Sequence, residues 1–529
     1  MTAQVKKKLS VTLVRGPIVM GAGSVNNEAT PAIGFAYIMG YLKDREYKVQ
    51  MVDAIGEGLN QFWPFRERPS FQCQGLTFDE ILKKIPKDSN VIAFSGMFSG
   101  EWPVLRSLIN KIRESFPNAL FVAGGEHVTA LTEYVVRDCL ALDICVRGEG
   151  EHTFYEVLRT YSETGSCCDI LGTGYLDESG KYHQVNSDNR IGNTPRMRDI
   201  ANIPWPYWPD GYLENFWEAG KSYGVSSERD MPFMLSRGCP YQCTFCSNPQ
   251  MWTTRYVLRD IDDVIAEIKH YITRYNITSI QLYDLTAITK KKWTVEFLNR
   301  LIDENIFLNW SLPSGTRSEV LDKETLELLS KTGCKYLVYA PESGSKDTLI
   351  KIKKRIDLAK LTASVLEAKR QGLNTRINLI IGFPHETWRN VFETIKYGLK
   401  MSMKGVDEVP LFIFSPYPGT EIFDGLEQRG KLVLNDDYFF SLTSLNGTYT
   451  DPNAVVSYSP HLSSKKLGYT RTVFILLNYI VGYLFYPVRI YRTINILLSK
   501  NKKASTVFEH RLQDLFKRIS RNNIYNDTK

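Results

Sequence analysis

The stretch that decides the fold is MPFMLSRGCPYQCTFC, residues 231–246, in which Cys239, Cys243 and Cys246 follow a short apolar segment. Three thiolates at this spacing on one loop can bind three irons of a cubane cluster and leave the fourth iron open for a ligand. With nine cysteines in 529 residues, such a spacing arises by chance with a probability of roughly 0.003. We therefore predict that this loop holds a 4Fe-4S cluster.

A structural zinc site is the strongest alternative for these thiols. Such a site takes four Cys or His ligands, and no other Cys or His lies within twenty residues of the triplet. The cluster is therefore favoured over zinc, and also over three unrelated buried cysteines.

The cysteine loop stands at the beginning of a strand-helix series that continues to about residue 440. Amphipathic stretches such as Ile261–Tyr275 and Asp357–Gln371 separate short apolar runs. Six such units predict a partial (β/α)6 barrel of the TIM type, with its working residues at the strand ends. The strands are expected at Phe233–Ser236, Ser279–Tyr283, Leu308–Leu312, Tyr336–Ala340, Arg376–Ile381 and Pro410–Phe414.

The first 161 residues show the same alternation of strands and helices. This pattern predicts an α/β domain with a doubly wound, Rossmann-like parallel sheet, covered by helices on both faces. Polar and glycine-rich loops that follow the strands would meet in a crevice at the carboxyl edge of the sheet. The strands are expected at Leu9–Arg15, Lys48–Asp53, Val91–Ser95, Leu120–Ala123 and Asp143–Val146.

We predict four parts along the chain. Residues 1–161 form the Rossmann-like domain, 162–228 a linker, 229–440 the barrel and 441–529 a helical, basic C-terminal region. The linker is rich in Gly, Asp, Pro and aromatic residues, so we expect it to pack irregularly between the two domains.

The formal charge of +7 is concentrated at the C-terminal end. Residues 461–529 contain 13 Lys and Arg against 3 Asp and Glu, and the remainder carries a slight negative charge. The main body therefore gives no support from charge for binding nucleic acid. The cysteines are too sparse for a disulfide scaffold and no secretory leader is recognised, so we expect a reducing cytoplasm.

The apolar run Val473–Tyr486 has 14 residues and is interrupted only by Asn478 and Gly482. A membrane-spanning helix needs about 20 apolar residues, so we do not predict one here. The dispersed Lys and Arg that follow are typical of a helix lying at an anionic membrane interface. A helix buried against the barrel explains the pattern equally well, so peripheral membrane contact is one of two open interpretations.

The cysteine spacing after the first barrel strand resembles that of the radical S-adenosylmethionine (SAM) superfamily, and the resemblance extends to about Ser415. It implies that SAM binds the open iron and is cleaved to a 5'-deoxyadenosyl radical. Phe245 and Gly382 would lie near the adenine, and Asp284 would face the SAM ammonium or the substrate. The implied SAM-binding residues are Phe245, Glu342, Ser343, Gly382 and Asp284.

A doubly wound domain ahead of such a barrel resembles the cobalamin-binding radical SAM enzymes, which include methyltransferases and an anaerobic cyclase. Their loop glycines allow the backbone to approach a bulky planar ligand. The usual Asp-x-His-x-x-Gly motif is absent, and a lone loop histidine such as His127 is more often a hydrogen-bonding residue than a cobalt ligand. The implied cobalamin-binding residues are Ser95, Gly96, Gly124, Gly125, Glu126, His127, Arg147, Gly148 and Glu149.

The resemblance implies a methyltransferase that acts on an unactivated carbon of a hydrophobic, lipid or natural-product substrate, through the radical and methylcobalamin. An external flavodoxin or ferredoxin would supply the electron. The alternatives are an oxidative cyclase acting on a porphyrin or lipid and, from a different class, a non-catalytic cobalamin sensor. A methylthiotransferase is disfavoured, because the N-terminal cysteines lack cluster spacing and the C-terminal region reads as helical.

Overall fold

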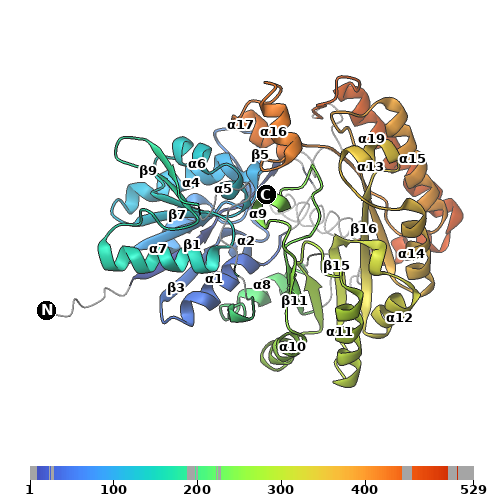
Figure 1. Cartoon of the computed structure of the whole chain (residues 1–529), viewed down its shortest axis with the longest axis horizontal. Helices are drawn as coiled ribbons and strands as arrows, with labels where there is room; N and C mark the ends of the chain where they lie inside the picture. The colour runs from blue at the N-terminus through green and yellow to red at the C-terminus, as the bar shows by residue number, and fades with distance from the viewer. Residues whose placement is uncertain are drawn as a thin grey trace, which may run out of the picture.

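The computed structural model describes residues 9–22, 24, 29–186, 197, 200–221, 223, 228–443, 455–498 and 509. Two units, each built on a parallel sheet, lie side by side, one coloured blue to cyan and the other green to orange in Figure 1. The predicted α/β class is confirmed, with a Rossmann-like sheet, a six-stranded partial barrel and a helical C-terminal extension.

The first unit is a seven-stranded sheet in the order β10-β9-β8-β7-β6-β1-β3. Its five parallel strands agree with the predicted ones to within one residue, and an unpredicted antiparallel hairpin, β9–β10, extends one edge. The bounds are β1 Ser10–Arg15, β3 Lys48–Asp53, β6 Val91–Ser95, β7 Leu120–Gly124, β8 Ile144–Val146, β9 Thr173–Leu176 and β10 Tyr182–Gln184.

Helices cover both faces of this sheet. Helices α1 (Ile33–Lys43) and α7 (Gly150–Thr164) bury one face, and α3 (Phe78–Lys84), α4 (Trp102–Ser115) and α6 (Thr132–Asp138) bury the other. The chain passes from β1 to β3 on one side and then to β6 on the other. The order therefore reverses between β1 and β6, which is the position where open parallel sheets typically bind ligands at the carboxyl edge.

The second unit is a six-stranded parallel sheet in the order β11-β14-β15-β16-β17-β18. The bounds are β11 Asp230–Phe233, β14 Ser279–Leu282, β15 Asn309–Thr316, β16 Cys334–Glu342, β17 Asn374–Ile381 and β18 Leu411–Ile413. Its outer helices include α10 Ile261–Tyr275, α11 Lys291–Asp303, α12 Lys323–Lys331, α14 Leu358–Arg370 and α15 Trp388–Met403. Helix α10 has the predicted bounds because Asp260 caps its first turn and Asn276 ends it in a left-handed conformation.

The two units share buried cores. Trp208 and helix α8 (Tyr212–Glu218) of the connecting segment pack with barrel residues such as Phe233 in one continuous apolar cluster. After the barrel, helix α17 (Asp436–Leu442) returns to the first unit, where Phe439 packs in the same cluster as Trp102. Figure 1 shows α17 and α16 (Glu421–Glu427) between the two units at the top.

The C-terminal helices α19 (Ser464–Phe485) and α20 (Val488–Leu498) lie on the outside of the barrel. Helix α19 packs on α15, and its buried stripe includes Leu467, Arg471, Phe474 and Asn478. No single described helix has the length and apolar character needed to cross a bilayer, although α19 and the first two turns of α20 do as a pair bent by 111°.

Candidate functional site

Cys239, Cys243 and Cys246 lie on the loop between β12 (Ser236–Arg237) and α9 (Asn248–Met251). All three thiols are free and partly exposed. The side-chain amide of Asn248 donates a hydrogen bond to the Cys239 carbonyl oxygen at 3.0 Å and so joins the two ends of the loop. We call residues 238–247 the cluster loop, because its donor set fits the three irons of a cubane cluster.

The thiols do not gather as the ligands of one ion would. Among the described residues, no three His, Cys, Asp or Glu side chains converge on a point that could hold a single metal ion. In a cubane cluster each thiolate binds a different iron, so its ligands need not converge in that way.

Two cations face the cluster loop from the barrel. Burial raises the pKa of all three thiols, that of Cys246 to about 12, whereas Lys354 and Arg317 lower the pKa of Cys239 and of Cys243. The Arg317 guanidinium also lies 3.5 Å from the ring centroid of Tyr241, within the cluster loop. Positive charge at this position stabilises thiolates.

Glu342 ends β16 with a positive φ of 69° and is buried. Its carboxylate forms an ion pair with Lys354 at 3.0 Å, and both side chains are about one-tenth exposed. Burial works against the Lys354 ammonium, but the charges of Glu342 and Cys243 outweigh burial and raise its pKa. Glu342 is therefore paired with a lysine whose charge also acts on Cys243, and this lysine was not predicted from the sequence.

Ser343 lies beside Glu342 but turns into the protein. Its hydroxyl is within 2.8 Å of the Thr394 hydroxyl on α15, and it accepts a hydrogen bond from the amide of Ser345. The side chain is fully buried, so these bonds shape the loop after β16. Contact with SAM stays a prediction for this residue.

Phe245 and Gly382 approach each other at the end of β17. The ring of Phe245 meets that of Phe383 edge to face, with centroids 5.7 Å apart. Gly382 has a φ of 91°, and a Cβ there would lie 2.7 Å from Leu467 of α19. The glycine is therefore required by the C-terminal helix as well as by the backbone conformation.

Asp284 follows β14 and is fully buried. Its carboxylate accepts hydrogen bonds from the amides of Leu235 and Ser236 and from the Ser236 hydroxyl. Burial raises its pKa to about 6. These bonds hold the segment that leads into the cluster loop, and the predicted contact with SAM or substrate stays a prediction.

Both ends of the cluster loop touch the first unit. Just before the loop, Arg237 pairs with Glu149 at 3.2 Å and with Glu151 at 2.6 Å, and all three side chains are buried. At its last residue, the Ser247 hydroxyl donates to Glu126. Glu126 and Glu149, which were predicted to bind cobalamin, thus form a hydrogen bond and an ion pair with residues of the barrel.

The loops after β6 and β7 form a close glycine contact. Gly96 donates to the Gly124 carbonyl at 2.7 Å, and a Cβ on Gly125, whose φ is 119°, would lie 2.6 Å from the Gly96 oxygen. Beside them Ser95 ends β6, and Met97 and Phe98 are 42% and 57% exposed. Exposed apolar side chains at this edge fit the face of a large planar ligand such as a corrin.

His127 is enclosed within the first unit. Its Nδ1 lies 2.9 Å from the Ser99 hydroxyl, and its ring contacts those of Trp102 and Phe439. Burial lowers its pKa to about 3, so the imidazole is neutral. This packing agrees with the expectation of a hydrogen-bonding histidine.

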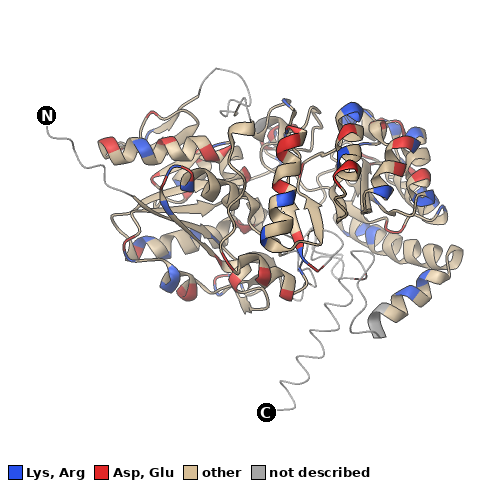
Figure 2. Cartoon of the chain, turned by 90° about the horizontal axis from the view of Figure 1, so that it is seen from below, with Lys and Arg blue, Asp and Glu red and all other residues tan. Residues whose placement is uncertain are grey.

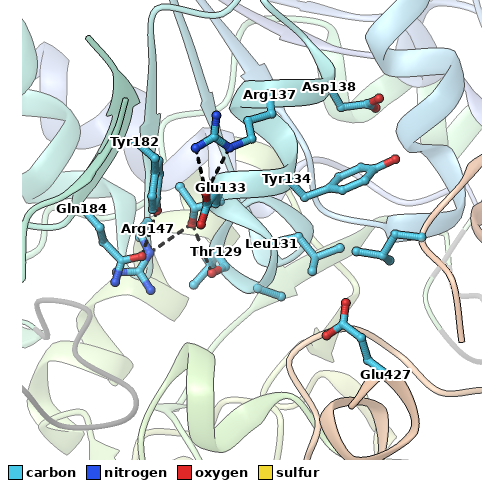
Figure 3. A pocket seen from close by; sticks show the side chains of 13 residues that line it. Thr129, Leu131, Glu133, Tyr134, Arg137, Asp138, Arg147, Tyr182, Gln184 and Glu427 are labelled. Carbon is cyan, nitrogen blue, oxygen red and sulfur yellow. Dashed lines mark hydrogen bonds and ion pairs between the residues drawn. The ribbon is translucent and has the colours of Figure 1, made fainter. Parts of the chain in front are cut away.

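Arg147 and Gly148 follow β8. The Gly148 amide donates to the Thr129 hydroxyl at 2.9 Å, and Arg147 donates to Thr132 at 3.1 Å and to Asn186 at 2.9 Å. Arg147 lines a cavity of about 580 Å³. Figure 3 shows Thr129 and Tyr134 on one side of this cavity and Glu427 of α16 on the opposite side.

Sequence reasoning missed several residues of this region. Lys354 stands in a run of basic residues that resembles a solvated surface, and Arg317 has no motif around it. Arg237 lies only two residues before Cys239, which was the one available signal.

Two family models match the chain. The Radical SAM superfamily model covers residues 233–398, and the B12 binding domain model covers residues 22–158. The first range contains the cluster loop, and the second contains all the loops at the carboxyl edge from β6 to β8.

Curated relatives and solved structures resemble most of the chain. An uncharacterized methyltransferase of Pyrococcus horikoshii is 29% identical over 79% of this chain and 83% of its own length. The anaerobic magnesium-protoporphyrin IX monomethyl ester cyclase of Rubrivivax gelatinosus is 23% identical over 78% of this chain and 69% of its own. The cobalamin-dependent S-adenosylmethionine radical enzyme OxsB, solved with aqua-cobalamin and S-adenosylmethionine, has the same fold, with a TM-score of 0.64 and 14% identity over 98% of this chain and 81% of its own.

Proposed function

Because this chain belongs to the cobalamin-binding radical SAM enzymes, we propose that it methylates an unactivated carbon of a small hydrophobic molecule. The observation that carries the proposal is the contact between the cluster loop and the carboxyl-edge loops of the first unit, through Arg237–Glu149 and Ser247–Glu126. In this proposal the contact brings the site of SAM cleavage beside the corrin site. Methyl transfer to a carbon radical needs that proximity.

When bound, the cofactors supply the chemistry: one SAM gives its methyl group to the reduced corrin, and a second is cleaved at the cluster by one electron. The substrate carbon would lose a hydrogen atom to the adenosyl fragment, which leaves as 5'-deoxyadenosine, and would then take the methyl group together with one electron from the corrin. Each turnover would therefore use two electrons, one for SAM cleavage and one to restore the reduced corrin. The reductant is an external one-electron donor of the flavodoxin or ferredoxin type.

The chain's own residues hold and orient these groups. In this proposal Cys239, Cys243 and Cys246 bind the cluster, while the Glu342–Lys354 pair offers a carboxylate and an ammonium to the polar end of SAM. The backbone of Phe245 lies against the adenine in this proposal, and Asp284 keeps the cluster loop in place through its bonds to Leu235 and Ser236.

The first unit holds the corrin by its backbone. In this proposal the Ser95, Gly96, Gly124, Gly125 and Gly148 backbone approaches the ring, and Arg147 reaches its polar periphery from the neighbouring cavity. Met97 and Phe98, which lie exposed at the same edge, cover the lower face. An apolar cover of this kind excludes water from the cobalt.

The test is a measurement of both SAM products. Protein reconstituted anaerobically with iron, sulfide and hydroxocobalamin is reduced with titanium(III) citrate and given SAM. We expect S-adenosylhomocysteine from methyl transfer to the corrin and 5'-deoxyadenosine from cleavage, and in a Cys243→Ala variant only the second product disappears. Absence of both products from fully loaded protein would contradict an enzyme and favour the non-catalytic sensor.

An oxidative cyclase is the second candidate, and the similarity to the Rubrivivax cyclase favours it. A cyclase takes the radical from SAM but not its methyl group. It therefore predicts 5'-deoxyadenosine without S-adenosylhomocysteine, and the same product analysis separates the two functions.

We also propose that α19 and α20 lie on a membrane surface. Both helices expose large apolar side chains, here together called the C-terminal apolar face, and no charged residue lies between Arg471 and Arg489. In Figure 2 the exposed length of α19 is accordingly tan. The face consists of Tyr469, Val473, Leu476, Leu477, Ile480, Leu484, Phe485, Val488, Ile490, Tyr491 and Ile494, each at least 41% exposed.

Two of the basic residues beside this face hold α20 against the barrel. Arg489 donates to the carbonyls of Gly405 and Val406 and pairs with Asp407 at 3.4 Å, and Arg492 lies 3.9 Å from the same carboxylate. The apolar side chains therefore carry most of the proposed binding, and insertion of one side chain contributes roughly 1.5–3 kcal/mol.

Flotation with phosphatidylcholine vesicles, with and without phosphatidylglycerol, tests this contact. We expect the protein to float with both vesicles, and Leu476→Asp to remain in solution. Phe307→Asp is the matched control, because Phe307 is 70% exposed elsewhere on the barrel. Equal behaviour of the two variants would contradict the membrane contact.

A further inference from the structure

The cluster loop is held at both of its ends by carboxylates of the first unit. Arg237, directly before the loop, meets Glu149 and Glu151 from the segment after β8. Ser247, at the end of the loop, meets Glu126 from the segment after β7. The two ends of the loop therefore contact the segments that follow β7 and β8, two neighbouring strands of the first unit.

The contact around Arg237 is a buried group of charged side chains. Arg237 is 6% exposed, and its guanidinium also lies 4.9 Å from the ring centroid of Tyr37 on α1. The second oxygen of Glu149 accepts a hydrogen bond from the amide of Met197 at 2.8 Å. Since burial strips water from every member, loss of one partner would leave charges uncompensated.

The carboxylates belong to the same short loops as the glycines that would face the corrin. Glu126 follows Gly125 directly, and Glu149 follows Gly148. A ligand that packs against the glycine backbone would restrict the position of the adjacent carboxylates. Those carboxylates in turn restrict the ends of the cluster loop.

From this arrangement we infer that the two cofactor sites are energetically coupled through Arg237 and Ser247. Corrin bound at the carboxyl edge orders the cluster loop, and an assembled cluster strengthens corrin binding by the same factor, because coupling between two sites is reciprocal. The inference rests on the proposed function, since it needs both cofactors to bind. Arg237 and Ser247 act here as positioning residues.

The experiment measures the dissociation constant of hydroxocobalamin by its absorption, on the full chain with and without the reconstituted cluster. We expect the cluster to tighten binding about tenfold, a typical size for coupling between sites. Hydrogen exchange of residues 238–247 gives the reciprocal readout, and we expect it to slow when hydroxocobalamin is added. Neither readout depends on turnover.

Four variants isolate the contacts. Arg237→Met removes the charge at one end, and Ser247→Ala removes only a hydroxyl at the other, so the second variant remains informative if the first fails to fold. Ser107→Ala is the matched control for Ser247→Ala, because it removes an exposed hydroxyl of α4 that donates to Glu67, outside both cofactor sites. Arg159→Met removes an exposed arginine that pairs with Glu156 and Glu163 on α7 and controls for loss of charge alone.

With Arg237→Met and with Ser247→Ala, we expect the cluster to change corrin affinity by a factor close to one. With Ser107→Ala and with Arg159→Met, we expect the cluster to tighten corrin binding as it does in the unaltered protein. An undiminished effect in both Arg237→Met and Ser247→Ala would overturn the inference, as would the lack of any effect in the unaltered protein. Failure of the proposed function is measured separately, in the products formed from SAM, because a protein that binds both cofactors and couples them can still form no S-adenosylhomocysteine.

Discussion

The two parallel sheets end in loops of different character. In the barrel, Cys239, Cys243 and Cys246 are partly exposed and free. In the first unit, Glu126, His127 and Glu149 are all engaged by other residues of the chain. The barrel thus keeps its reactive side chains available, whereas the first unit leaves mainly backbone and apolar surface at its edge.

The difference between available and engaged side chains matches the way each sheet would bind its cofactor. A cluster needs covalent ligands from side chains, and these cannot also serve as structural contacts. A large planar ligand can be held by shape and by backbone groups, so the polar side chains of its loops are free to join the two domains.

The largest effect is expected from removing a cluster ligand. Cys243→Ala should lose the iron-sulfur absorption, and its 5'-deoxyadenosine formation should fall to background, because the remaining thiols cannot hold the cluster in place. Corrin binding should remain, which a visible spectrum checks. Retention of full SAM cleavage would remove the cluster loop from its proposed role.

A second large effect is expected at the buried ion pair beside the cysteines. Lys354→Met should cost roughly 3–5 kcal/mol, because it leaves the Glu342 carboxylate buried without a partner. Chemical denaturation measures the loss. The double variant Glu342→Gln with Lys354→Met should recover part of it, and no recovery would mean that the lysine stabilises the protein by another contact.

Gly382 and Gly372 allow the cost of backbone strain to be separated from the cost of overpacking, because only Gly382 is tightly packed. Gly382→Ala should cost roughly 1–3 kcal/mol more than Gly372→Ala, because overpacking adds to the backbone strain. The two glycines have φ values of 91° and 80°, but only the first would place a Cβ against Leu467. Unfolding free energies of both variants test this, and Leu467→Ala added to Gly382→Ala should relieve the packing part. Equal costs would contradict it.

The smallest effect concerns His127 and depends on pH. Burial lowers its pKa to about 3 in the folded state, below an unfolded value of about 6.5. The unfolded chain therefore binds more protons between these values, so stability is present above about pH 6.5 and is lost as the pH falls toward 3.

His127→Phe should remove this acid-sensitive part of the stability curve while changing the stability at pH 7.5 by only about 1 kcal/mol. Denaturation at pH 5 and pH 7.5 checks the prediction. The EPR spectrum of bound cob(II)alamin should be the same in both proteins. A nitrogen splitting present only in the unaltered protein would identify His127 as a cobalt ligand.

Much of the fold was predictable because buried parallel strands read as short apolar runs. All five parallel strands of the first sheet and all six barrel strands were expected near their observed positions. The hairpin β9–β10 was missed because Thr173–Leu176 and Tyr182–Gln184 are short and half polar. The hairpin joins the sheet because β9 pairs with β8, and the sequence of the hairpin alone does not reveal this pairing.

The site was predictable only where chemistry imposes a spacing. The cysteines follow such a rule, whereas Lys354 meets Glu342 only through the way α13 (Lys346–Lys351) returns the chain toward β16. Glu126 and Glu149 were recognised as motif residues, but their partners, Ser247 and Arg237, lie at least 88 residues away. Such contacts come from tertiary packing and leave no local pattern.

In the proposed function, cluster and corrin lie next to each other where the two units meet. The EPR relaxation of bound cob(II)alamin tests this directly when it is compared with and without a reduced cluster in the same protein. We expect faster relaxation or a dipolar splitting with the reduced cluster, and neither change in Cys243→Ala. An unchanged cob(II)alamin signal in protein that holds both cofactors would contradict it.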